Sequence, residues 1–155
     1  MAYTKLVGVE SAIGGIRLMN REVREEVAAV TKRSLKAVRQ HAFHHAPVSN
    51  EEKKDGEKHL NRTIRAKVAK GSLHGVVTAG GKGARHANLV EGGTKAHAIT
   101  SKKGKVLTDG KRVFGKAVKH PGMKAQPFMG PALASEADNY KRGVAQAVKK
   151  KVVNA

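Results

Sequence analysis

The sequence predicts an α+β fold in which two main amphipathic helices pack on a small, mostly antiparallel β-sheet, with a long basic β-hairpin projecting from it. Two observations lead to this prediction. Apolar residues recur every three to four positions near both ends of the chain, as on one face of a helix. Between these stretches lie short apolar runs bounded by glycine and polar residues, a pattern typical of strands and turns. A chain of 155 residues has the length of a single domain.

The first predicted helix covers residues 18–44, in a segment that extends to residue 46. Asn20 is a candidate N-cap, glutamates lie near the start and basic residues near the end, and Pro47 ends the helix. Its apolar stripe is formed by Val23, Val27, Leu35, Val38 and Ala42, with Val30 beside them. We expect this stripe to pack on the sheet.

The region 60–94 is predicted to form the sheet. Residues 60–69 and 73–78 have the composition of two short strands, and Gly71 between them suits a hairpin. A short helix or turn follows and ends at Gly92-Gly93.

Residues 97–119 predict a long hairpin around the dipeptide Asp109-Gly110, which favours a type I′ turn. Few apolar residues are available to anchor its tip, so a protruding arm is expected rather than a core hairpin. Its basic side chains are the candidate partner-binding residues: Lys102, Lys103, Lys105, Lys111, Arg112 and Lys116.

The last predicted element is an amphipathic helix over residues 131–152. Pro131 has the place of a proline at the first helical position, and the lysines at 149–151 suit the negative end of the helix dipole. Residues 1–17 are expected to be an N-terminal arm. The apolar stripe of the last helix is formed by Leu133, Ala137, Tyr140, Val144, Val148 and Val152.

The composition predicts a thin hydrophobic core. The chain has three Phe, two Tyr and no Trp, and its apolar residues are mostly Ala and Val. Large aromatic side chains bury the most area per residue, so their scarcity limits the core. A chain of this kind is expected to gain stability by assembling with neighbours.

The formal net charge of +19 has two interpretations: general solvation of the surface by lysine, or contact with nucleic acid or with strongly acidic protein surfaces. Binding of single strands by base stacking is not expected, because aromatic residues are scarce. Phosphate contact by lysine and arginine stays open. The absence of cysteine excludes disulfides and thiolate zinc sites. No stretch resembles a membrane span or a signal peptide, so synthesis in a cytoplasm is expected.

Motifs for catalysis or cofactor binding are incomplete. His41 and His45 lie one helical turn apart, but the glutamate of the zinc-protease motif is missing. Gly110, Gly115 and Lys116 have the spacing of a phosphate-binding loop, but Ala117 replaces the required Ser or Thr. No serine lies in a nucleophile elbow. The sequence therefore predicts neither an enzyme nor a cofactor or metal site.

A set of short motifs follows in a distinctive order along residues 18–150. In order, the motif residues are Pro47, Gly56, Leu60, then Glu91, Gly92, Gly93 and Thr94, then Pro127, Phe128 and Pro131. This order resembles the tail-completion family of long-tailed bacteriophages, also called head–tail joining or minor tail proteins. The family's compact Pro-Val-Asp-Thr-Gly-x-Leu turn is interrupted here by an insertion between Val48 and Asp55, and its Thr is absent.

The resemblance implies a structural protein of the virion neck, assembled in the host cytoplasm. It implies a homo-oligomeric ring, expected to hold six copies, that completes the tail and joins it to the head around a channel for DNA. The implied partners are other copies of the chain, a head connector or stopper protein, and a tail terminator or tail tube protein. No membrane partner is implied. The alternative is a small basic DNA-binding protein of nucleoid or ribosomal type, which the charge alone favours.

The same motif residues have plain structural roles. Gly92 and Gly93 can supply positive φ for a turn, where Glu91 could accept backbone hydrogen bonds. Pro127 and Pro131 bracket Phe128, so the ring of Phe128 is predicted to fill the core at the entry to the last helix.

Overall fold

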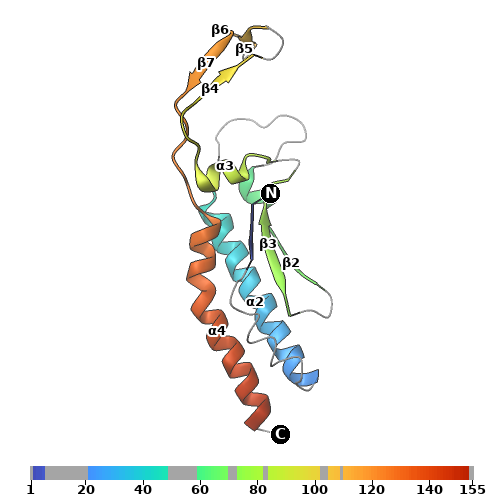
Figure 1. Ribbon diagram of the computed structural model, residues 1–155. Coiled ribbons are helices and arrows are strands. Elements are labelled where there is room, and N and C mark those ends of the chain that lie inside the picture. Colours follow the sequence, from blue (N-terminus) through green and yellow to red (C-terminus); the bar gives the residue numbers. More distant parts are fainter. Residues whose placement is uncertain are drawn as a thin grey trace.

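The computed structural model describes residues 2–5, 21–48, 59–69, 73–81, 84–101, 105–108 and 110–153. It confirms the predicted α+β class. Two long helices lie side by side, a small sheet packs beside one of them, and a two-stranded arm projects beyond one end of the body (Figure 1).

Helix α2 (Arg21–His45) confirms the first predicted helix. Every residue of the predicted apolar stripe is buried, and Thr31 and Ser34 are buried with it. Thr31 remains satisfied there because its hydroxyl donates to the Val27 carbonyl at 2.9 Å. Residues 18–20, including the predicted N-cap Asn20, lie outside the described residues.

Helix α4 (Met129–Val153) packs along α2, but its buried face differs from the predicted one. Tyr140 is buried as predicted, whereas Leu133, Ala137, Val144 and Val148 are only half-buried. The centre of the contact is shifted because small residues let the two helices approach closely; at Gly143, an added Cβ would lie 2.9 Å from the Val30 side chain. The buried residues of α4 are Met129, Ala132, Tyr140 and Ala147.

The start of α4 corrects a second prediction. Because the helix begins at Met129, Pro131 is its third residue and not its first. Proline is still acceptable there, because the N–H groups of the first turn have no partner within the helix.

The main sheet has the strand order β1-β3-β2 and is antiparallel throughout. Strands β2 (Arg65–Val68) and β3 (Gly75–Ala79) form the predicted hairpin. The third strand is β1 (Ala2–Lys5), so these four residues pair with β3 instead of forming part of a free N-terminal arm.

A 3-10 turn replaces the first part of the strand predicted over residues 60–69. This turn, η1 (Leu60–Thr63), is held by the Thr63 hydroxyl, which donates to the Leu60 carbonyl at 2.6 Å and accepts from the Gly80 N–H at 3.0 Å. Its side-chain hydrogen bonds compete with strand pairing, and β2 begins only after the buried Ile64.

The core consists of two clusters arranged along α2. One joins the C-terminal half of α2 to the sheet and to the start of α4, with Leu35, Ile64 and Phe128 as its largest members. The other lies between the two helices and contains Val27, Val30, Leu73 and Tyr140. Valine and alanine supply most of both clusters, so the core is thin, as the composition predicts.

The remaining elements lead into the arm. Helix α3 (Ala87–Gly92) confirms the predicted short helix. The chain then enters strand β4 (His97–Thr100), which pairs with β7 (Ala117–His120), and strand β5 (Leu107–Thr108), which pairs with β6 (Val113–Gly115). The predicted hairpin is therefore confirmed as a two-part ribbon. Its turn residue Asp109 lies outside the described residues.

Candidate interaction surface on the projecting arm

The arm, defined as the described residues between 97 and 120, has no hydrophobic core of its own. All four residues of β4 are exposed, and the other three strands contain no buried residue. Its larger apolar side chains lie in solvent: Val113 is 71% exposed and Phe114 is 46% exposed. A two-stranded ribbon of this kind is only marginally stable by itself in water. Its surface is therefore available to a partner that would cover it.

The charge of the arm has one sign. Apart from histidines, every ionisable side chain in its described part is basic. Lys105, Lys111, Arg112 and Lys116 are exposed, as expected for partner-binding residues, whereas Lys102 and Lys103 lie outside the described residues. Exposed apolar and basic groups together suit an acidic protein surface with apolar patches.

At the base of the arm, Thr94 and Met123 pair as an isolated antiparallel β-bridge. The Thr94 N–H donates to the Met123 carbonyl at 2.8 Å, and the Met123 N–H donates to the Thr94 carbonyl at 3.0 Å. Two glycines allow this approach. Gly93 has φ +68°, and an added Cβ would lie 2.7 Å from backbone atoms of Met123 and Ala125. Gly122 has φ +88°, and an added Cβ would clash with the Thr94 carbonyl oxygen.

Glu91 fastens the arm base to helix α4. Its carboxylate accepts the backbone N–H groups of Phe128 at 2.9 Å, Met129 at 3.0 Å and Gly130 at 2.9 Å. These are donors that the first turn of a helix leaves without intrahelical partners, and the negative charge lies at the positive end of the helix dipole. The expectation that Glu91 accepts backbone hydrogen bonds is confirmed, but these donors lie at the start of α4 and not in the turn of Gly92 and Gly93.

The other motif residues differ in backbone conformation and in burial. Of the pair Gly92-Gly93, only Gly93 has positive φ, because Gly92 is the last residue of α3. Phe128 is fully buried in the core, as predicted, while Pro127 and Pro131 on either side of it are exposed. Leu60 belongs to the same core cluster, and Pro47 is half-buried after α2. Gly56 lies outside the described residues.

The structure therefore brings together the last two motifs, which the whole arm separates in the sequence. Glu91, Gly93 and Thr94 meet the segment from Met123 to Phe128, and the Gln126 N–H donates to the Val90 carbonyl at 2.9 Å. Sequence reasoning did not find the contact between Glu91 and α4. The only sequence signal for it was a carboxylate in a glycine-rich turn, which does not identify its distant partner.

The histidines at the end of α2 make local contacts. The rings of His41 and His45 are stacked with their centroids 4.1 Å apart, and His45 Nδ1 is 2.9 Å from the His41 carbonyl oxygen. Within the described residues no group of three or more His, Asp or Glu side chains is placed to hold a metal ion. Gly110 and Gly115 belong to the arm, with positive φ at both, and do not lead into a helix.

No family model, curated protein or solved structure matches this chain. Among the described helices, none has the apolar length that crossing a bilayer requires.

Proposed function

We propose that this chain is a non-enzymatic structural protein of a bacteriophage neck, forming a ring of six copies that completes the tail and joins it to the head connector. The projecting arm carries the proposal. Val113 and Phe114 are exposed on a ribbon without a hydrophobic core, which favours a role in which another surface covers them. In a ring, each arm reaches a neighbouring copy or the adjoining ring.

The arrangement at the arm base also supports the proposal. The motifs behind the resemblance to tail-completion proteins surround the point where the arm leaves the body, at Glu91, Gly93, Thr94 and Phe128. These residues set the direction of the arm relative to α4. A ring protein needs this direction to be fixed, because each copy must meet its neighbours at the same angle.

The test is to image purified virions of the phage that encodes the chain and to determine the position and symmetry of its density. The expected result is a closed ring in the neck, between connector and tail tube. Absence of the chain from mature virions would overturn the proposal.

A small DNA-binding protein of nucleoid or ribosomal type is the second candidate, and the net charge of +19 favours it. The two candidates differ in the behaviour of the free protomer. Salt-dependent binding to duplex DNA at physiological ionic strength would favour the second candidate, and weak binding under the same conditions would favour the neck protein.

A further inference from the structure

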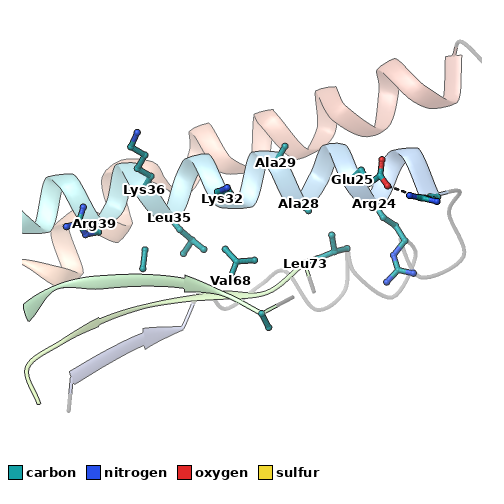
Figure 2. Close-up of a pocket in the computed structure, with 13 residues that line it drawn as sticks. Arg24, Glu25, Ala28, Ala29, Lys32, Leu35, Lys36, Arg39, Val68 and Leu73 are labelled. Atoms are coloured by element: carbon teal, nitrogen blue, oxygen red, sulfur yellow. Dashed lines mark hydrogen bonds and ion pairs between the residues drawn. The ribbon is translucent and has the colours of Figure 1, made fainter. Parts of the chain in front are cut away.

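A groove of about 1100 Å³ runs along the body, on the side of α2 that faces β2. Figure 2 shows it between the helix and the strands, with Arg39 towards one end, Arg24 towards the other and Leu35 and Leu73 between them. We call it the α2–β2 groove. It lies on the body and is separate from the arm.

The floor of the groove is apolar. Ala66 and Val68 lie two residues apart on β2, so both side chains point to the same face of the sheet, towards α2. Val68 is 37% exposed, although Leu35 beside it is buried. On the helix, Ala28 and Ala29 are small, which leaves room for side chains from outside.

The rim of the groove is basic. Six charged residues line it, of which five are basic and one, Glu25, is acidic. Glu25 is already paired with Arg21 at 2.8 Å, and this hydrogen bond raises the pKa of the Arg21 guanidinium. Arg24, Lys32 and Arg39 follow one stripe of α2 and place positive charge along its length.

We infer that the α2–β2 groove is a docking site for an extended acidic segment of a partner protein, in which apolar residues alternate with Asp or Glu. Apolar side chains of that segment enter the floor, and its carboxylates meet the basic rim. β2 is an edge strand within the described sheet, so an extended segment can lie alongside it. The inference does not depend on the assignment to a phage neck.

Charge and chemistry select this occupant over others. A second copy of the chain has 31 Lys and Arg against 12 Asp and Glu, so it offers the basic rim of this groove fewer carboxylates than an acidic segment does, whatever contacts the copies make elsewhere. Duplex DNA would satisfy the basic rim, but its phosphates would leave the exposed apolar side chain of Val68 uncovered. An acidic amphipathic segment satisfies both surfaces.

The length of the groove sets the probe. From Arg21 to Arg39, α2 rises by about 27 Å. An extended chain of about eight residues spans that distance. The probe is therefore a fluorescent peptide of about eight alternating Leu and Glu residues, added to the full-length chain in about 0.15 M salt and followed by fluorescence anisotropy.

The test variant reverses two rim charges, Arg24→Glu with Lys32→Glu. Its matched control makes the same change in net charge outside the groove, Arg33→Glu with Lys150→Glu, at two exposed positions. The rim variant is expected to weaken peptide binding about tenfold or more, and the control is expected to change it less than about threefold. Val68→Asp, at a partly exposed position, tests the floor and is expected to weaken binding without unfolding the chain.

Each alternative has its own outcome. Equal losses of peptide affinity in the rim variant and the control would show that net charge alone causes the effect, and would overturn the inference. Undiminished binding of a peptide with Ser in place of Leu would overturn the role of the floor. Self-association that the rim variant abolishes would assign the groove to a second copy. Tighter binding of a duplex oligonucleotide than of the peptide, lost in the rim variant alone, would assign it to nucleic acid.

Discussion

Glu91 connects the chain that enters the arm with the chain that leaves it. Its carboxylate accepts three backbone N–H groups at the start of α4, each at 2.9–3.0 Å. Charged hydrogen bonds of this kind are stronger than neutral ones. One side chain thereby stabilises both the N-terminus of a long helix and the position of the arm base.

Replacing Glu91 tests this connection. Glu91→Ala is expected to lower the free energy of unfolding by about 1–3 kcal/mol, because three donors lose their common acceptor. Glu91→Gln is expected to lose less, because its carbonyl oxygen still accepts while the favourable charge at the helix dipole is gone. Urea denaturation of the full chain measures both. Glu25→Ala, at an exposed ion pair, is the control and should change little. Equal stability of Glu91→Ala and the wild type would refute the role.

Two adjacent glycines offer a matched comparison. Gly93→Ala is expected to lower the free energy of unfolding by about 1–3 kcal/mol, because alanine is strained at φ +68° and its Cβ would meet the backbone of Met123 and Ala125. At Gly92, no atom lies within 4 Å of an added Cβ and the backbone is helical, so Gly92→Ala should be neutral or stabilising. Hydrogen exchange at the amides of Thr94 and Met123 measures the effect. Equal protection in both variants would contradict the argument.

Among the secondary-structure elements, those with a long periodic apolar pattern were predicted from the sequence. Helix α2 was predictable because its apolar stripe continues over many turns and all of it is buried. Strand β1 was not, because only four residues form it and their pairing with β3 depends on a distant segment. The buried face of α4 was displaced for a similar reason: the close approach at Gly143 depends on Val30 of the other helix.

The candidate site was predictable in outline but not in its contacts. The absence of apolar anchorage predicted an exposed arm, and the strand pairing confirms its position. The α2–β2 groove could not be predicted, because its two sides come from residues 21–39 and from residues 66–69 with Leu73, which no local pattern relates.

Shortening the arm separates its contribution from that of the body. Residues 102–116 are removed and Ser101 is joined to Ala117 through an Asn-Gly turn, which suits a two-residue hairpin. The free energy of unfolding is expected to change by less than about 0.5 kcal/mol, because the described part of the removed segment contains no buried residue. Head-to-tail joining is expected to fail, and plaque assays with electron microscopy of the particles measure it. Normal infectious particles would reject the role of the arm.

At the scale of the whole molecule, the net charge of +19 constrains how a ring can be arranged. Each phosphate contact adds a salt-sensitive attraction, so a strongly basic lumen would hold the DNA that must pass through it. We therefore expect the arm residues Lys105, Lys111 and Arg112 to face outward or towards acidic neighbouring rings. Their positions in an imaged neck decide the matter: lysines that line the channel and touch DNA would make the protein a DNA-gripping ring.

If basic arms meet acidic neighbouring rings, the rate at which heads and tails join should depend on ionic strength. Basic arms approaching acidic surfaces associate faster than neutral ones, and salt screens this attraction over about 8 Å at physiological ionic strength. Joining of purified heads and tails should therefore slow as salt is raised, while the melting temperature of the chain changes little. A joining rate that is independent of salt would exclude electrostatic steering.

The β-bridge between Thr94 and Met123 allows the length of the arm to vary. Two residues that exchange both backbone hydrogen bonds have Cα atoms about 5.5 Å apart, so the arm begins and ends at nearly the same point of the body. The arm can therefore be replaced by a longer or shorter ribbon without moving Thr94 or Met123. The distance that the protein reaches and the stability of its core can then change independently.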